Sequence, residues 1–200
     1  MRENGKYAVI VAHPGDETLW AGGIILMHPQ ADWTIISLCG KNDLDRGTKF
    51  SKALLQLNAK GDIGDLNDDP DQPPLNKKLV QNTILQLLPS DRFDLVFTHG
   101  PWGEYTRDTR HEETSKAVSA LWESEQLLTH HVWMFAYEDS GRKSLPYAVM
   151  TADFKTRLID DIWKKKYDII TNIYGFSPDS FEAKTTPKEE AFWCFEHDKL

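Results

Sequence analysis

Short runs of apolar residues recur along the chain and are separated by stretches with helical periodicity. The run YAVIVA at 7–12 is continuous and rich in β-branched residues, which is typical of a strand buried on both faces of a parallel sheet. Three further segments have the same character, namely WTIISL at 33–38, FDLVFTHG at 93–100 and HVWMFAY at 131–137. This pattern predicts buried strands at all four places.

Amphipathic segments between these runs predict helices at 17–28, 45–59, 77–89 and 111–128. In the second of them Phe50, Ala53 and Leu57 recur at helical spacing. Gly22 and Gly23 weaken the first helix and indicate close packing of its backbone against a strand or a ligand.

The rest of the chain is less regular. The segment 65–76 is polar and rich in proline, which indicates a surface loop. A basic helix is expected at about 153–167, with the lysines at 164–166 facing solvent. The aromatic segment 186–197 is expected to pack on the body of the protein.

Strands that alternate with helices predict an α/β fold, a Rossmann-like and mostly parallel sheet with helices on both faces. A chain of 200 residues with 40% hydrophobic residues is long enough for one compact domain, and no long linker divides it. We therefore expect a single domain spanning 1–200, with a less regular pattern after about residue 140.

Charge and cysteine content narrow the functional classes. The formal net charge is −8, which argues against binding to nucleic acid or to anionic membranes as a main role. Cys39 and Cys194 have no metal-binding spacing, and the chain has neither a signal peptide nor an apolar stretch of about 18 residues. These observations predict a cytoplasmic protein with reduced thiols and no membrane span.

Polar clusters follow two of the predicted strands, at 13–17 and at 99–111. Ligands of open α/β sheets bind in the crevice at the carboxyl ends of the strands, so both clusters are expected there. His13 and Asp16 lie on a strand-to-helix turn and can converge on one metal ion. The second cluster offers further candidate ligands, namely His99, Glu104, Asp108 and His111. Spacing alone leaves open a structural histidine and a helix-capping aspartate.

The segment VIVAHPGDETLWAGG at 9–23 closely resembles the AHPDDE motif of the PIG-L/LmbE-like family of zinc-dependent de-N-acetylases. The strand FDLVFTH, the turn PWGEY and the helix RHEETSKAV resemble the second conserved block of that family. The resemblance implies a Rossmann-like fold and the removal of acetyl groups from N-acetylglucosamine-type sugars or related small amides. The resemblance implies a small N-acetylated molecule as partner, and this molecule is expected to be sugar-linked.

Position by position, the resemblance makes His13, Asp16 and His111 the zinc ligands. Two nitrogens and one carboxylate leave a coordination position for water, and zinc lowers the pKa of such a water to about 7. The implied reaction is the attack of this water on the amide. The same donor set also suits non-haem Fe(II), so both metals stay open.

Gly15 stands where the family has the aspartate that acts as general base. A positioned base contributes about 10²- to 10⁴-fold in rate, so another group would have to replace it. Asp108 is the first candidate for an acid or base, and Glu17 is a second that more often orients the loop. Arg107 and Arg110 also replace family residues ahead of His111.

Further contacts to the substrate are expected from the turn and from the loop after the second strand. Tyr105 matches a family tyrosine that contacts the reaction intermediate, and Glu104 lies beside it. Trp102 is placed to stack on a sugar, and Arg46 stands where relatives carry a substrate-binding arginine.

Two hypotheses of different classes follow. The first is a zinc-dependent amidohydrolase that uses a non-standard base. The second is a catalytically degenerate member that keeps the pocket as a metal- or sugar-binding module, which Gly15, Arg107 and Arg110 favour. A metal-free nucleotide binder would need a phosphate-binding loop that the sequence lacks. Assembly into a homo-oligomer stays open.

Overall fold

The computed structural model describes residues 1–71, 73–105 and 108–197. Its main sheet has seven strands in the order β3-β2-β1-β4-β5-β9-β8. The strands are β1 (Lys6–Val11), β2 (Asp32–Cys39), β3 (Ala59–Leu66), β4 (Leu95–Thr98), β5 (His131–Phe135), β8 (Phe154–Arg157) and β9 (Glu189–Glu196). The first five strands of this order pair in parallel, whereas β9 is antiparallel to both β5 and β8. A small second sheet pairs β6 (Tyr137–Glu138) with β7 (Tyr147–Ala148).

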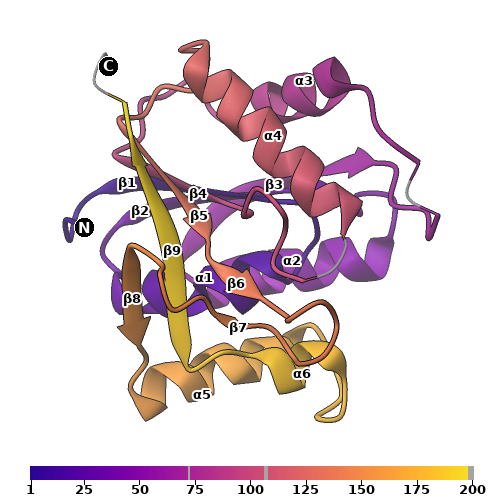
Figure 1. Cartoon of the computed structure of the whole chain (residues 1–200), viewed down its shortest axis with the longest axis vertical. Helices are drawn as coiled ribbons and strands as arrows, with labels where there is room; N and C mark the ends of the chain where they lie inside the picture. The colour runs from indigo at the N-terminus through magenta and orange to yellow at the C-terminus, as the bar shows by residue number, and fades with distance from the viewer. Residues whose placement is uncertain (72, 106–107, 198–200) are drawn as a thin grey trace.

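Helices cover both faces of the main sheet, as Figure 1 shows. On one side lie α3 (Lys77–Leu87) and α4 (Thr109–Glu123). On the other lie α1 (Asp16–Met27), α2 (Leu44–Gln56) and α5 (Asp160–Asp168), which runs on into the π-helical segment η1 (Ile169–Ile173). The short helix α6 (Phe181–Thr185) follows. The predicted fold, a mostly parallel α/β sheet between two helical layers, is confirmed.

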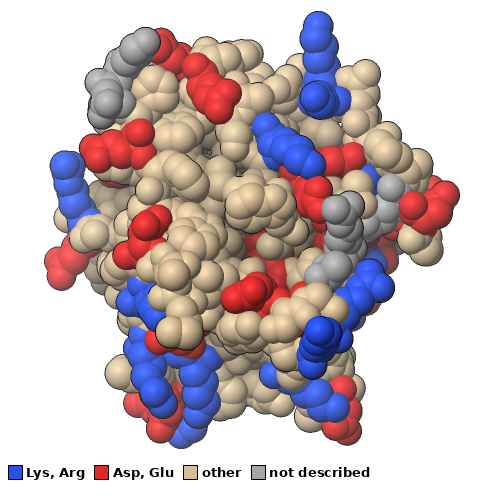
Figure 2. Space-filling model, in the orientation of Figure 1, with Lys and Arg blue, Asp and Glu red and all other residues tan. Residues whose placement is uncertain are grey.

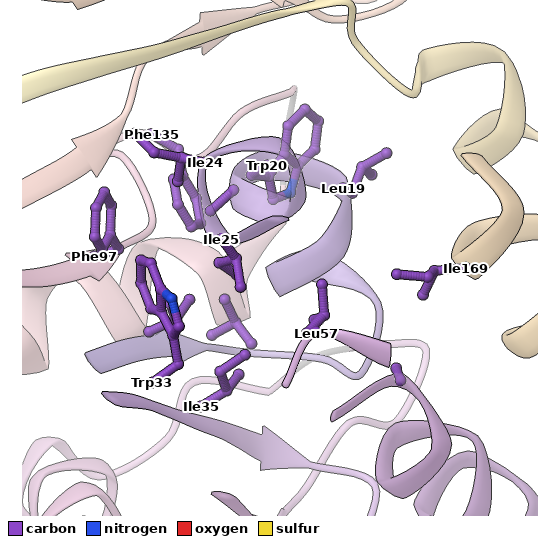
Figure 3. Close-up of a cluster of buried hydrophobic side chains, with 14 of the residues drawn as sticks. Leu19, Trp20, Ile24, Ile25, Trp33, Ile35, Leu57, Phe97, Phe135 and Ile169 are labelled. Carbon is purple, nitrogen blue, oxygen red and sulfur yellow. The ribbon is translucent and has the colours of Figure 1, made fainter. Parts of the chain in front are cut away.

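Each face of the sheet has its own hydrophobic core. In Figure 3, Trp20 and Ile24 from α1 lie over Trp33 of β2 and Phe97 of β4. The opposite core joins residues of α3 and α4 to the sheet, and Val118 is typical of it. Burial of each large apolar side chain contributes about 1.5–3 kcal/mol, so the two layers hold the sheet rigidly from both sides.

The order of the strands reverses beside β1. The chain passes from β1 to β2 and β3 on one side, and then crosses to β4 and β5 on the other. The segments that follow β1 and β4 therefore leave the same edge of the sheet toward opposite faces, which opens a crevice between them. Both polar clusters of the sequence begin in these segments.

Two segments differ from the sequence prediction, and a third agrees with it and gains a defined structure. Residues 59–66, which the periodicity did not mark, form the edge strand β3, whose largely polar side chains lie exposed. The expected helix at 153–167 is a short edge strand, β8, followed by α5. The aromatic segment near the C-terminus packs on the body as β9, inserted between β5 and β8.

Lys166 does not face solvent, contrary to the prediction for the lysine run. It is completely buried, and its Nζ lies 2.7 Å from Oε1 of the equally buried Glu190. The Glu190 carboxylate also accepts hydrogen bonds from the backbone N–H groups of Gly23 and Ile24. This buried pair joins α5 and β9 to α1, close to the glycines that allow the approach.

The surface carries charges of both signs. Figure 2 shows acidic and basic side chains interspersed over one face of the molecule. Within the described ranges, no helix combines the length and apolarity needed to cross a membrane.

Candidate metal centre

Three side chains from the two polar clusters meet in the crevice. His13 lies on the turn between β1 and α1, Asp16 is the first residue of α1, and His111 lies in the first turn of α4. The Nδ1 atom of His13 is 3.2 Å from Oδ2 of Asp16 and 3.3 Å from Nε2 of His111. The latter atom is 3.3 Å from the same Asp16 oxygen.

These three donor atoms form a nearly equilateral triangle. Donors around a tetrahedral ion with bonds of about 2.0–2.1 Å are separated by about 3.3 Å, so the edges match this geometry. Two imidazoles and one carboxylate are also chemically suited to zinc or Fe(II). The residues present therefore fit a metal ion, and the triangle leaves one side open toward solvent.

Local capping explains why α4 presents His111 so precisely. Asp108 is the N-cap of this helix, and its Oδ1 accepts hydrogen bonds from the backbone N–H groups of Arg110 and His111. Such a cap satisfies two donors that the helix leaves unpaired. The start of the helix, and with it the imidazole, is fixed.

In each histidine ligand, the ring nitrogen that points away from the triangle forms a hydrogen bond with a carboxylate. Nδ1 of His111 donates to Oε2 of Glu104 at 2.6 Å, and Nε2 of His13 donates to Oδ1 of Asp68 at 2.9 Å. Each hydrogen bond fixes the tautomer that leaves the remaining nitrogen as a lone-pair donor facing the triangle. Carboxylates of this kind orient metal-binding histidines and increase their basicity.

His99 is close to the triangle, but its nitrogens are engaged elsewhere. Its Nδ1 donates to Oε2 of Glu104 at 2.9 Å, and its Nε2 accepts the backbone N–H of Ala12 at 2.9 Å. The lone pair that a metal would need is therefore used. Asp16, His99 and His111 also lie close enough to form a ligand group, but this hydrogen bond favours His13 over His99.

The contacts between histidines and carboxylates also shift the pKa values of the candidate ligands. Burial alone would lower the pKa of His13, but hydrogen bonds and charges from Asp16 and Asp68 raise it to about 9. Burial would raise the pKa of Asp16, yet the neighbouring histidines hold it well below its usual value. The carboxylates thus stabilise positive charge where the three donors converge.

Gly15 is the N-cap of α1 and has φ of +109°, a conformation that residues with a side chain rarely adopt. A Cβ at this position would meet only Phe176, at 3.7 Å, so the space beside the triangle is open. The backbone N–H of Gly15 donates to Oε2 of Glu17. The glycine therefore serves the turn and leaves room next to the donors.

Glu17 and Glu104 are both completely buried. The Glu17 carboxylate accepts hydrogen bonds from the hydroxyls of Thr18 and Tyr174 as well as from Gly15, and burial raises its pKa. Glu104 accepts from two histidines and from the backbone N–H of Gly100. Among the described residues, neither lines the cavity that His13 and Asp16 line, whereas Glu104 lines a second one. Their contacts support the turn and the histidines, and the roles of Glu17 as base and of Glu104 as substrate contact stay predictions.

A cavity of about 500 Å³ lies beside the donors, where His13 and Asp16 line it and the completely buried His111 does not. Tyr105, Asp108 and Arg46 line it, and their roles in catalysis and substrate binding stay predictions. The Tyr105 hydroxyl is 3.4 Å from Oδ2 of Asp108, and that oxygen is 3.8 Å from Nε2 of His111. Asp108 therefore places one oxygen on the helix cap and the other beside the donors.

Trp102 lies elsewhere. Its side chain is 77% exposed and lines a second cavity of about 370 Å³, together with Trp193. Among the described residues, the cavity at the donors has no contribution from Trp102. The prediction that it stacks on a substrate held at the metal centre is not supported by this position.

Asp68 is a functional candidate that the sequence analysis missed, because it lies in the polar segment interpreted as a surface loop. Its two oxygens join Nε2 of His13 and Nη1 of Arg46. Arg110 holds the same loop, since its Nε donates to the carbonyl of Asn67 at 2.6 Å and its Nη1 pairs with Glu113. Arg110, which replaces a residue of the related family, thus has a structural role. Arg107, the other such replacement, lies outside the described residues.

No family model and no curated protein matches the chain. Solved structures do match it. One of them is teicoplanin deacetylase Orf2, in a structure described as the zinc-inhibited form. The alignment covers 98% of this chain and 100% of Orf2, with a TM-score of 0.67 and 15% sequence identity. The N,N′-diacetylchitobiose deacetylase from Pyrococcus horikoshii matches with a TM-score of 0.65 and 16% identity, over 96% of this chain and 84% of that one.

A third match has a different reaction. GalB, the 4-carboxy-2-hydroxymuconate hydratase from Pseudomonas putida, aligns over 98% of both chains with a TM-score of 0.65 and 13% identity. One fold therefore supports both amide hydrolysis and hydration in these proteins, so the chemistry of this chain has to be argued from its own site. The chain has the α/β fold of deacetylases such as those of the PIG-L/LmbE type that its sequence resembles.

Proposed function

We propose that the protein is a metal-dependent hydrolase that removes an acetyl group from an N-acetylglucosamine-type sugar or a related small amide. The observation that carries the proposal is the triangle of His13, Asp16 and His111, with edges of 3.2–3.3 Å, at the cavity. The deacetylases that share the fold support the same reaction class.

His13, Asp16 and His111 would hold the ion, and Asp68 and Glu104 would orient the two histidines. A bound Zn²⁺ or Fe²⁺ would supply a Lewis acid that polarises the amide carbonyl and lowers the pKa of water. Because one structure of Orf2 is described as zinc-inhibited, the metal that supports activity has to be tested and not assumed.

The remaining task is proton transfer, and Gly15 has no side chain for it. We assign this role to Asp108, whose Oδ2 lies on the cavity 3.8 Å from Nε2 of His111. A carboxylate there is placed to accept a proton from the attacking water and to pass it to the leaving amine. The Tyr105 hydroxyl, next to Asp108, is placed to donate a hydrogen bond to the substrate oxygen.

The second candidate is a catalytically degenerate protein that binds a metal or a sugar without turnover. Gly15 favours it, because the open space beside the donors takes the place of a side chain that the related motif supplies. In this case the metal centre and the cavity would persist, but no acetate would be released.

Metal analysis combined with a deacetylation assay on N-acetylglucosamine conjugates tests the proposal. The protein is stripped with a chelator and reloaded separately with Zn²⁺, Fe²⁺ or no metal. Acetate release that depends on a metal and is lost in His13→Ala and Asp16→Ala supports a hydrolase. Stoichiometric metal without acetate release supports the binding module, and a protein in which neither variant alters metal content contradicts both.

A further inference from the structure

The cavity beside the metal centre is lined by two kinds of side chain from different parts of the chain. Apolar and aromatic groups come from the segment that follows α5, and they comprise Ile170, Tyr174, Phe176 and Phe181. Charged groups come from the start of α2 and its N-cap and from the loop that follows β3, and they comprise Asp43, Asp45, Arg46, Lys49, Asp68 and Asp69. A ligand that fills the cavity meets both.

Both cations of the described lining are already engaged by carboxylates. Nη1 of Arg46 lies 3.0 Å from Oδ2 of Asp68, and Nε of Arg46 lies 3.6 Å from Oδ2 of Asp43. Nζ of Lys49 lies 2.6 Å from Oδ2 of Asp45. Arg46 is therefore not poised to receive an anionic substrate, as a substrate-binding arginine would be.

Negative charge dominates the described lining of the cavity. Seven carboxylates, from Asp16, Asp43, Asp45, Asp68, Asp69, Asp108 and Glu182, face two cations. A divalent ion at the donors would still leave a net charge of about −3. A cavity with this charge repels anionic ligands and raises the local concentration of cationic ones.

The aromatic side chains add a second, independent preference for cations. The face of an aromatic ring attracts an ammonium group, and carboxylates and aromatic rings together are the usual surroundings of a bound amine. Phe176 and Phe181 are only partly buried or exposed, so their rings are accessible to a ligand in the cavity.

On the basis of the proposed function, we propose that the substrate is an N-acetyl amide that also carries a free, positively charged amine. The amide would lie at His13, Asp16 and His111. The ammonium group would lie toward Asp69 and Glu182, two carboxylates of the lining that form no ion pair with another described residue. Two sources share this chemistry, a mono-acetylated diamine and a partly deacetylated amino sugar. Asp69 and Glu182 are then specificity-determining residues.

Amides of equal length that differ only in terminal charge test this inference. The diamine series is N-acetyl-1,4-diaminobutane, N-(4-hydroxybutyl)acetamide and 4-acetamidobutanoate, assayed with the metal-loaded protein. The sugar arm compares glucosaminyl-N-acetylglucosamine with N,N′-diacetylchitobiose. We expect kcat/KM to be about ten-fold higher for the cation than for the neutral amide, and lower still for the anion, with the preference shrinking at high salt.

Charge-removing variants assign the preference to the cavity. In Asp69→Asn/Glu182→Gln the ratio of kcat/KM for the cationic and neutral amides should fall by about two- to five-fold per charge. Both substitutions keep the size of the side chain and free no cation of the lining. The matched control is Glu123→Gln, an exposed residue about 18 Å along α4 from His111, where the ratio should not change.

Calorimetry separates this inference from the proposed function, because it needs no turnover. The probes are 1,4-diaminobutane, 4-amino-1-butanol and 4-aminobutanoate. Tighter binding of the diamine that is lost in the double variant, without hydrolysis of any amide, supports the inference and contradicts the hydrolase. Hydrolysis of the three amides with equal kcat/KM, or with a preference for the anion, overturns the inference and leaves the hydrolase in place.

Discussion

The carboxylate of Glu104 accepts a hydrogen bond of 2.6 Å from Nδ1 of His111, and all three bonds that it receives are buried. The oxygen that accepts from His111, Oε2, also accepts a hydrogen bond of 2.9 Å from Nδ1 of His99. One carboxylate thus sets the tautomers of two histidines. They differ in function because Nε2 of His99 accepts the backbone N–H of Ala12, whereas Nε2 of His111 faces His13 and Asp16.

The first prediction separates these two histidines by metal affinity. His111→Gln should remove a ligand, whereas His99→Gln should only disturb an outer contact and weaken binding by at most about 10- to 100-fold. Affinity is measured by competition with a chromogenic chelator. Equal losses in the two variants, or a larger loss in His99→Gln, would show that His99 is the ligand.

The second prediction concerns acid stability of the metal-free protein. Burial would raise the pKa of Glu104, but His99 and His111 hold it at about 2, against an ordinary value of 4.5. The depressed pKa means that the ionised form stabilises the fold above pH 4.5, and that this contribution is lost as the pH falls from 4.5 toward 2. Its size is on the order of 3 kcal/mol.

Urea unfolding of the wild type and of Glu104→Gln, in the presence of a chelator, measures this contribution. The difference in unfolding free energy between the two proteins should shrink as the pH falls below 4.5. A difference that is independent of pH down to pH 3 would contradict the assigned charge of Glu104.

Much of the fold could be predicted because its central strands are unusually apolar. The segments at β1, β2, β4 and β5 are buried on both faces by the two helical layers, and such burial leaves a continuous apolar run in the sequence. The edge strand β3 has one neighbour and its charged side chains are exposed, so its sequence AKGDIGDL has no such run. Edge strands depend on pairing with their neighbour, which local sequence does not record.

Some residues of the candidate site can likewise be predicted from the sequence, and others cannot. His13 and Asp16 follow a strand directly, and the resemblance to a known motif supports their role together with that of His111. Asp68 lies far from all three in sequence and reaches His13 only because β3 pairs beside β2. A lysine run in a helix is usually exposed, which predicts that Lys166 faces solvent. Its burial depends on Glu190, which is distant in the sequence.

The third prediction concerns the hydrogen bond that ties the cavity wall to the metal-binding turn. The Tyr174 hydroxyl donates to Oε1 of Glu17 at 2.7 Å, and Glu17 in turn holds the N–H of Gly15. Tyr174→Phe leaves a buried carboxylate short of one donor, which should cost about 1–3 kcal/mol of unfolding free energy and weaken metal binding. The control is Tyr167→Phe, whose ring packs on Trp163.

Chemical unfolding and metal competition on both tyrosine variants make this measurement. Tyr167→Phe should retain the metal affinity of the wild type. If Tyr174→Phe lowers stability while the metal affinity stays unchanged, Tyr174 supports the fold alone and has no influence on the metal-binding turn.

The fourth prediction asks what a side chain does at Gly15. At φ of +109° any L-residue is strained, so Gly15→Ala and Gly15→Asp should both lose about 1–3 kcal/mol of stability, although the Cβ has space. Comparison of kcat between the two variants cancels the strain and isolates the carboxylate. We expect a ratio near one, because Asp108 already occupies the proton-transfer position. A Gly15→Asp variant several hundred-fold faster than Gly15→Ala would instead identify the wild type as a weakened catalyst.

The fifth prediction tests Asp108, whose two oxygens have separable functions. Oδ1 caps α4 through the N–H groups of Arg110 and His111, and Oδ2 lies beside the donors. Asparagine keeps the capping oxygen and removes the basic one, so Asp108→Asn should unfold at nearly the same urea concentration and bind metal normally. Its kcat should fall by about 10²- to 10⁴-fold if Asp108 transfers the proton. Asp108→Ala, which loses the cap as well, should in addition lose about 0.5–2 kcal/mol of stability. An Asp108→Asn variant with full activity would return proton transfer to another group, and a variant that loses metal would make Asp108 a ligand.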